Sequence, residues 1–120
     1  MPWNVEVTDE CRAWLEALNE DDFDAIDYSV DLLTERGPQL DHPHSSKING
    51  SKHANMRELR VQSGGRPIRV FYAFDPRRTA ILLLGGDKTG DKRFYDRMIP
   101  IADSLYDVYL SELKKEGLFE

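Results

Sequence analysis

Two arginines near the middle of the chain, Arg60 and Arg69, have the type and spacing to hold a phosphate group. They flank Gly64–Gly65, a pair typical of a two-residue hairpin loop, because glycine adopts positive φ at both positions without strain. With that loop, Arg60 lies opposite Arg69 on one face of a two-stranded ribbon. Like charges in this arrangement cost about 0.2 to 1 kcal/mol, and a bound anion would offset the repulsion. The alternative is that Glu58 or Asp87 neutralises the pair.

A second group of cations follows the most apolar stretch of the chain. Residues 79–84 are apolar on both faces, which predicts a strand inside a sheet that ends at Gly85–Gly86. The loop 87–93 then places Lys88, Lys92 and Arg93 among glycines that allow close approach of a backbone. It lacks the glycine spacing of a nucleoside-triphosphate loop. These three cations are therefore candidate site residues.

The distribution of charge supports a polyanionic ligand, although the whole chain has a net charge of -6. Residues 47–93 hold eleven basic and four acidic side chains, whereas residues 1–46 hold two basic and twelve acidic ones. Salt screens charges beyond about 10 Å, so a local basic face decides what binds. The middle third can bind phosphate while the acidic ends keep the chain soluble.

Composition excludes several classes of protein. The chain has 120 residues, 40% apolar and 32% charged, which predicts one globular domain over residues 1–120. No long apolar run or secretory signal is visible, so we expect no membrane partner and a cytoplasmic location. Cys11 is the single cysteine, and the three histidines form no recognisable zinc spacing with it. We expect no metal and no cofactor.

The elements that must position these side chains follow from periodicity. Residues 3–7 alternate as a short strand, Thr8 caps a helix to about residue 18, and a second helix runs from residue 20 to residue 36. The two helices are expected to form an antiparallel hairpin on the sheet. The acidic face of the second helix is either a solvated face or a docking surface for a basic partner. Residues 39–55 read as an irregular surface loop.

Three consecutive strands and a C-terminal helix complete the chain. Pro100 marks either a kink in that helix or its start. The order β-α-α-β-β-β-α predicts an α+β domain, in which an N-terminal helical hairpin and a C-terminal helix pack on a small, mostly antiparallel sheet. The large aromatic side chains are expected in the core: Trp3, Trp14, Phe23, Phe71, Phe74 and Tyr109.

Four segments together resemble a known family: ELR at 58–60, IRVFYAFD at 68–75, LLLGGDKTGDKRFY at 82–95 and IPIADSLYDVYL at 99–110. They resemble the RelE/ParE superfamily of bacterial toxins, in particular its HigB-like (phage Gp49-like) branch. The resemblance implies a RelE-like fold and a metal-independent endoribonuclease that enters the ribosomal A site, cleaves mRNA and inhibits translation. It also implies a cognate helix-turn-helix antitoxin as partner.

Carried onto this chain, the resemblance assigns catalytic roles to Arg60, Arg69, Lys88, Lys92 and Arg93. The candidate substrate-binding residues are Lys52, which lies in the polar loop 39–55, together with Arg57, Asp87 and Tyr95. Cleavage through the 2′-hydroxyl needs a base for its proton, cations for the phosphorane oxygens and an acid for the leaving oxygen. Several HigB-like enzymes use histidines, but residues 87–97 contain none. The hypothesis is a lysine or aspartate of residues 87–93 as base, with Arg93 or Arg69 as acid or charge stabiliser.

Two alternatives remain open at this point. Within the same fold, ParE-like toxins bind DNA gyrase without cutting RNA, and the dense cations here favour the nuclease over that role. A basic sheet that only binds RNA, with no catalysis, is the third possibility. Intact message with DNA breaks would indicate gyrase inhibition, and protection of RNA without cleavage would indicate the binding module.

Overall fold

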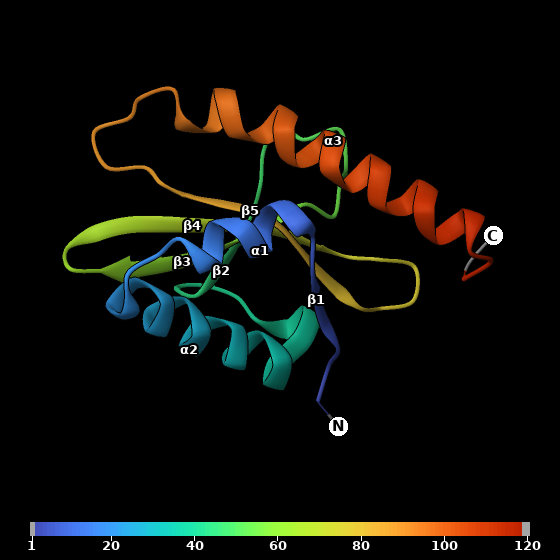
Figure 1. Cartoon of the computed structure of the whole chain (residues 1–120), viewed down its shortest axis with the longest axis horizontal. Helices are drawn as coiled ribbons and strands as arrows, with labels where there is room; N and C mark the ends of the chain where they lie inside the picture. Colours follow the sequence, from blue (N-terminus) through green and yellow to red (C-terminus); the bar gives the residue numbers. More distant parts are fainter. Residues whose placement is uncertain (1, 119–120) are drawn as a thin grey trace.

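The computed structural model describes residues 2–118, in which three α-helices and a short 3₁₀ turn surround a five-stranded sheet (Figure 1). In chain order the elements are β1 (Val5–Val7), α1 (Asp9–Glu16), α2 (Glu20–Arg36), η1 (Gly37–Gln39), β2 (Ser45–Lys47), β3 (Arg57–Ser63), β4 (Arg66–Phe74), β5 (Ala80–Asp87) and α3 (Phe94–Lys115). The predicted α+β class is confirmed. The predicted order is also confirmed, except that the structure adds the short strand β2.

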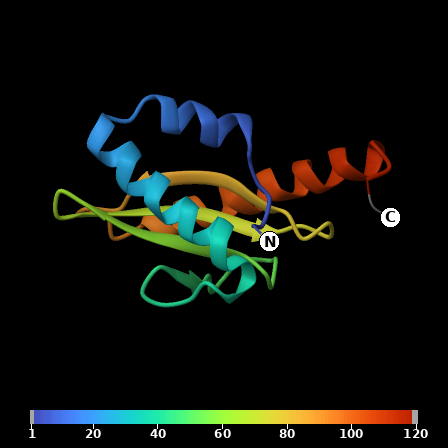
Figure 2. The same ribbon diagram turned by 90° about the horizontal axis from the view of Figure 1, so that it is seen from below.

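Helices cover both faces of the sheet, whose strand order is β1-β5-β4-β3-β2. Strand β1 runs parallel to β5, and the other neighbours are antiparallel. One core lies between the sheet and α1 and α2, and a second lies between the sheet and α3 (Figures 1 and 2). Because side chains alternate along a strand, Leu59 and Val61 enter the first core, while Phe71 and Ala73 enter the second.

Side-chain caps define the helical hairpin. The Thr8 hydroxyl accepts a hydrogen bond from the Cys11 amide at 3.0 Å, and the Asn19 side chain accepts one from the Asp22 amide at 2.8 Å. These bonds satisfy amide groups that a helix start leaves without intrahelical partners. Helix α1 ends at Glu16, two residues earlier than predicted, whereas the predicted bounds of α2 are confirmed.

The predicted β3–β4 hairpin is confirmed together with its register. Gly64 and Gly65 have φ values of 58° and 77°, and Ser63 pairs with Arg66 across them. Arg60 pairs with Arg69. The turn therefore aligns the two arginines as the glycine pair predicts.

The prediction that residues 39–55 are irregular is wrong for β2. This strand pairs with the edge of β3 through backbone hydrogen bonds, and the Ser45 hydroxyl lies 2.6 Å from the Tyr72 hydroxyl. Its sequence, Ser-Ser-Lys, has no apolar alternation, so its strand conformation comes from the neighbouring edge rather than from its own pattern.

The prediction that the innermost strand ends at Gly85–Gly86 is also wrong, because β5 continues to Asp87. A side chain at Gly85 would overlap the ring of Trp14, and one at Gly86 would lie 3.0 Å from the ring of Phe94. The glycines are therefore required by aromatic rings that pack on both sides of the strand, rather than by a turn.

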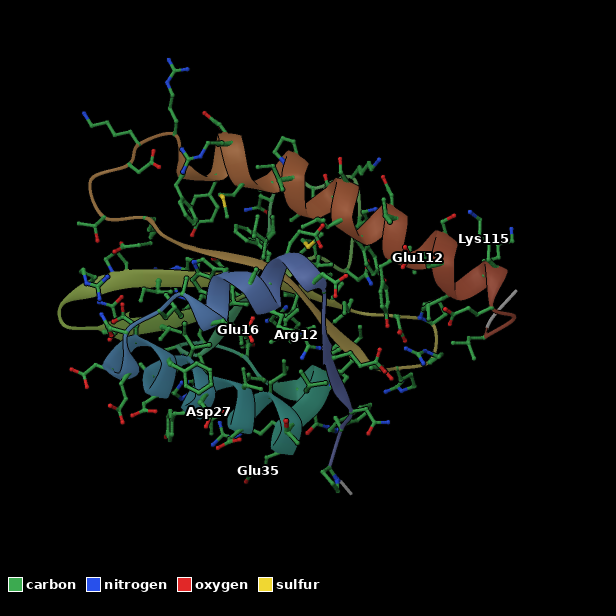
Figure 3. The ribbon with its side chains drawn as sticks, viewed as in Figure 1. Arg12, Glu16, Asp27, Glu35, Glu112 and Lys115 are labelled. Carbon is green, nitrogen blue, oxygen red and sulfur yellow. The ribbon has the colours of Figure 1, made fainter. Side chains whose placement is uncertain are left out.

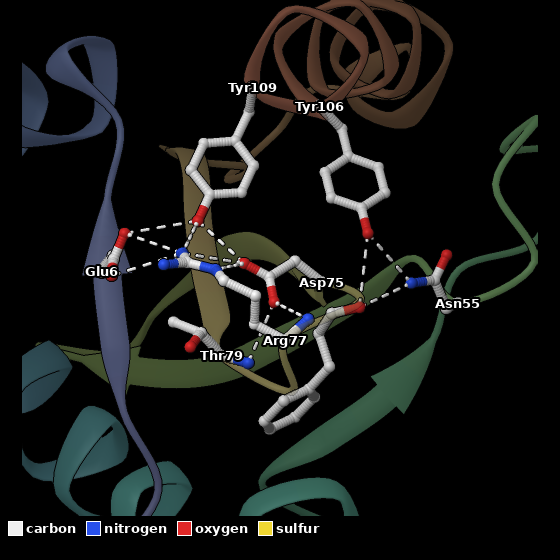
Figure 4. A network of polar contacts seen from close by, with 8 residues as sticks. Glu6, Asn55, Asp75, Arg77, Thr79, Tyr106 and Tyr109 are labelled. Carbon is white, nitrogen blue, oxygen red and sulfur yellow. Dashed lines mark hydrogen bonds and ion pairs between the residues drawn. The ribbon is translucent and has the colours of Figure 1, made fainter. Parts of the chain in front are cut away.

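A polar network fixes α3 to the end of the sheet that lies away from the β3–β4 turn (Figure 4). Arg77 donates hydrogen bonds to Asp75 at 3.1 Å and to the Tyr109 hydroxyl at 2.7 Å, and it forms an ion pair with Glu6 at 3.3 Å. Burial and the neighbouring Asp75 raise the pKa of Tyr109. The network joins β1, the turn after β4 and α3, and it thereby sets the position of α3 over the sheet.

Helix α3 runs without interruption through Pro100, so the proline does not mark a helix start. One predicted core residue is wrong: Phe23 is 43% exposed on α2. No helix among residues 2–118 is both long and apolar enough to cross a membrane.

Candidate functional site

The paired arginines share one carboxylate. Glu58 precedes Arg60 by two residues on β3, so both side chains point to the face that α3 covers. One Glu58 oxygen lies 3.5 Å from Arg60 Nη1, and the other lies 3.6 Å from Arg69 Nε. Asp87 instead pairs with Arg66 at 2.8 Å. Of the two carboxylates that the sequence suggests as neutralising groups, Glu58 is the one in contact with the arginines.

Glu58 also holds two hydroxyl groups. Ser46 Oγ donates to one carboxylate oxygen at 2.9 Å, and the Tyr95 hydroxyl donates to the other at 2.8 Å. The Glu58 side chain is only 5% exposed, and its hydrogen-bond and ion-pair partners come from β2, β3, β4 and α3. We call the group of Glu58, Arg60, Arg69, Tyr95 and Lys88 the arginine–tyrosine cluster.

The two arginines differ in their access to solvent. The Arg69 side chain is 5% exposed, and its Nη1 donates to the backbone oxygen of Ile68 at 3.1 Å. Its Nε is buried and has no hydrogen-bond partner within residues 2–118. The Arg60 side chain is 36% exposed. A phosphate group can therefore reach Arg60, while the buried charge of Arg69 acts through Glu58.

Tyr95 connects the sheet to the loop that precedes α3. The ammonium group of Lys88 lies 5.3 Å from the centroid of the Tyr95 ring, within the range of a cation–π contact. Burial, and then the hydrogen bond to Glu58, raise the pKa of Tyr95. Its phenol therefore stays protonated at neutral pH.

The aspartates of the loop are occupied by neighbouring donors. Asp87 accepts hydrogen bonds from the Thr89 hydroxyl at 2.6 Å and from Arg66, and these contacts lower its pKa. Asp91 pairs with Arg97 at 2.7 Å, which likewise lowers its pKa. A carboxylate with a lowered pKa is a weaker base, so neither aspartate is well suited to take a proton from substrate.

Lys92 and Arg93 are exposed, and no ion pair joins either of them to an acid within the described range 2–118. The loop that carries them starts beside the hairpin, since the Lys88 amide donates to the Pro67 oxygen at 3.0 Å. It projects at the same end of the molecule as the β3–β4 turn (Figures 1 and 2). The loop that carries these cations and the β3–β4 turn therefore lie at the same end of the molecule.

Two predicted substrate-binding residues differ in their position relative to the cluster. Arg57 shares its strand face with Leu59, on the side of α1 and α2, and its Nε donates to Ser45 Oγ at 3.1 Å, so it lies away from the cluster. Lys52 pairs with Asp107 of α3 and lines a cavity of about 350 Å³ together with Tyr95. The structure therefore brings Lys52, but not Arg57, to the border of the arginine–tyrosine cluster. The sequence alone could have shown that Arg57 and Arg60 do not share a site. Side chains alternate along a strand, so residues 57 and 60 of β3 necessarily face opposite sides of the sheet.

Sequence reasoning missed Ser46 and gave Glu58 only a neutralising role. Ser46 lies in the strand that lacks an apolar pattern, so no local signal identifies it. No group of three His, Cys, Asp or Glu side chains in residues 2–118 is arranged to hold a metal ion. The polar groups of the cluster can instead bind an anion and exchange protons with it.

The sequence matches a defined family. The family model described as "Phage derived protein Gp49-like (DUF891)" matches residues 13–107. "Putative toxin HigB3" of Mycobacterium tuberculosis is 48% identical over 103 residues, which is 85% of this chain and 89% of that protein. The chain therefore belongs to the Gp49-like family and is similar to HigB toxins.

Solved structures agree on the fold. A mutant of the Escherichia coli toxin RelE in the free state is similar with a TM-score of 0.59 at 10% identity, over 82% of this chain and 96% of that one. The archaeal RelE–RelB complex from Pyrococcus horikoshii OT3 gives a TM-score of 0.55 at 17% identity, over 75% of this chain and 99% of the matched chain. At these identities the likeness defines the fold alone.

Proposed function

We propose that this chain is the toxin of a toxin–antitoxin pair and cleaves mRNA on the ribosome as a metal-independent endoribonuclease. The arginine–tyrosine cluster is the observation that carries the proposal. It combines an accessible guanidinium, an ammonium group and a protonated phenol around one buried carboxylate. These are groups that a phosphoryl transfer through the 2′-hydroxyl of RNA requires.

In this proposal Arg60 binds the scissile phosphate, because a guanidinium presents two parallel donors to phosphate oxygens. Lys88 and Arg93 add positive charge where the phosphorane oxygens become more negative. Glu58 fixes the orientation of Arg60 and Tyr95, and Arg69 balances the charge of Glu58. Arg69 is then a positioning residue rather than a direct phosphate ligand.

Two protons move in the reaction. Lys92, from the same loop as Lys88, takes the proton of the 2′-hydroxyl as its oxygen attacks phosphorus. The bond from phosphorus to the 5′-oxygen breaks, and that oxygen takes a proton from water while Arg93 stabilises its developing charge. The products are a 2′,3′-cyclic phosphate and a free 5′-hydroxyl. The lowered pKa values of Asp87 and Asp91 support a lysine over an aspartate as the base.

The partners follow from the same family. A RelE-like neighbour was solved in complex with RelB, which supports an antitoxin for this chain as well. We infer a helix-turn-helix antitoxin, the ribosomal A site and mRNA as partners, and the cytoplasm as the place of action.

Cleavage of mRNA on translating ribosomes, read by primer extension, tests the function. The unmodified chain is expected to cut within codons, and Arg60→Ala and Lys88→Ala are each expected to slow cutting at least about a hundredfold, as for loss of a transition-state donor. Arg12→Ala and Lys115→Ala remove exposed cations on α1 and α3 and serve as matched controls.

Three results would contradict the proposal. Full activity in both site variants would separate the cluster from the reaction. Intact message together with DNA breaks would indicate a gyrase inhibitor. Bound RNA that stays uncut on ribosomes would indicate a binding module without catalysis.

A further inference from the structure

An apolar groove opens on the side of the sheet away from the arginine–tyrosine cluster. It lies between α1, α2 and β1 and has a volume of about 430 Å³. Two residues of its lining, Ile26 and Leu82, are buried and belong to the core. A third, Phe23, is 43% exposed. The remaining apolar walls are partly exposed: Trp3, Val5, Val7, Leu15 and Val30. A groove of this size and lining can receive large apolar side chains.

An acidic stripe runs along α2 from Asp24 to Glu35, and its member Asp27 lines the groove. Asp24, Asp27, Asp31 and Glu35 follow one another at spacings of three and four residues, so they lie on one side of the helix. All four are exposed, and within residues 2–118 no basic side chain forms an ion pair with any of them. Figure 3 shows Asp27 and Glu35 on α2 on the same side of the molecule as Glu16 of α1.

The negative charge of the acidic stripe decides which kind of partner can bind in the groove. RNA and anionic lipid would be repelled by it. A second copy of the chain would place its own acidic stripe against this one in a two-fold interface. A protein helix with apolar residues on one side and Lys or Arg on its flanks matches both the groove and the stripe. Its cations would also relieve the repulsion between neighbouring carboxylates on α2.

We propose that the groove and the acidic stripe dock a basic amphipathic helix of the antitoxin. This inference rests on the proposed function for the identity of the partner. The docking surface is formed by α1, α2 and β1, and the arginine–tyrosine cluster lies on the face that α3 covers. A helix bound in the groove therefore leaves Arg60 and Lys88 uncovered. Inhibition then comes from the bulk of the antitoxin, which keeps the toxin out of the A site.

Calorimetric titration of the full chain with the purified product of the adjacent antitoxin gene tests the docking site. Asp24→Lys/Asp31→Lys is expected to weaken binding at least about tenfold, because two attractive charges become repulsive. Phe23→Ala removes a largely exposed ring and is expected to weaken binding through lost apolar contact. Glu112→Lys/Glu116→Lys, on α3 and at its C-cap, changes the net charge equally and is expected to bind normally.

Salt provides a second measurement on the unmodified pair. Affinity is expected to fall between about 50 mM and about 300 mM salt, and this dependence is expected to be smaller in Asp24→Lys/Asp31→Lys. Thermal unfolding of each variant checks that it still folds. Because Asp24 and Asp31 are exposed, their replacement is expected to leave the unfolding temperature unchanged. Normal affinity in both α2 variants would overturn the proposal, as would loss of affinity only in Arg60→Ala or Lys88→Ala.

Failure of docking and failure of the nuclease proposal give different results. Binding is measured without RNA, so antitoxin affinity that depends on α2 would support the docking surface even if the chain cut no message. Conversely, active toxin with groove-independent antitoxin binding would overturn only the docking surface. Self-association that disappears in Phe23→Ala would assign the groove to a second copy and would also overturn it.

Discussion

Removal of the Glu58 carboxylate is the sharpest test of how the cluster is held together. In Glu58→Ala the guanidinium of Arg69, with a side chain only 5% exposed, loses its neighbouring negative charge. Ser46 and Tyr95 lose their acceptor in the same substitution. Breaking one side of a buried ion pair costs about 3 to 5 kcal/mol, mainly because the remaining charge stays buried.

The expected loss is large enough to measure by thermal unfolding. For a chain of 120 residues, each kcal/mol lowers Tm by about 3 to 5 °C, so Glu58→Ala is expected to unfold about 10 to 25 °C below the unmodified protein. Urea unfolding gives the free energy independently of the enthalpy. Circular dichroism at low temperature checks that the variant still folds.

A double variant separates the buried charge from lost packing. In Glu58→Ala/Arg69→Met both charges are absent and the methionine fills much of the arginine volume, so a large part of the lost stability is expected to return. If Glu58→Ala unfolds within about 1 kcal/mol of the unmodified protein, the carboxylate does not balance a buried charge. If the double variant is no more stable than the single one, uncompensated charge is not the cause.

Three further outcomes follow from individual side chains. Burial raises the pKa of the Cys11 thiol to about 12, so Ellman's reagent is expected to leave it unmodified at pH 8 until denaturant is added; fast reaction of the folded chain would contradict this. Pro100 lies inside α3 and has no amide hydrogen to bond the carbonyl four residues earlier, so Pro100→Ala is expected to raise stability by about 1 to 3 kcal/mol in urea unfolding, and unchanged or lower stability would contradict this. Hydrogen bonds from Arg66, then from Ser63, lower the pKa of Asp22. Its stabilising effect is therefore complete above the pKa of an unfolded aspartate, about 3.9, and is lost as pH falls through the lower folded pKa. Asp22→Asn is expected to flatten the dependence of unfolding free energy on pH below about pH 4, and an unchanged slope would contradict that assignment.

Local signals in the sequence were sufficient for much of the fold. Thr8 and Asn19 define helix starts because their side chains bond amides three residues ahead. Gly64–Gly65 defines the hairpin register because few other residues adopt those φ values. Each of these features depends on atoms within a few residues, so no knowledge of the rest of the chain is needed.

The arrangement of the site depends on long-range contacts that no local pattern specifies. Residue spacing shows that Glu58 and Arg60 share a face of β3, but both faces of the sheet are covered, so the spacing does not show which helix lies above them. The hydrogen bond to Tyr95 joins residues 37 positions apart. The role of Ser46 likewise depends on a strand that forms only beside β3. Catalytic roles for the predicted residues stay predictions until cleavage is measured.

The two glycines near the end of β5 let aromatic rings from both helical layers approach the strand closely. Trp14 of α1 contacts the strand at Gly85, and Phe94, the first residue of α3, contacts it at Gly86. One strand of backbone separates these rings, so no intervening side chain can absorb a shift of either one. A bulkier residue in the α1 layer would therefore displace the start of α3 and the neighbouring Tyr95. A substitution at Trp14 is therefore expected to be transmitted to Phe94 on the other face, although a strand of backbone lies between the two side chains.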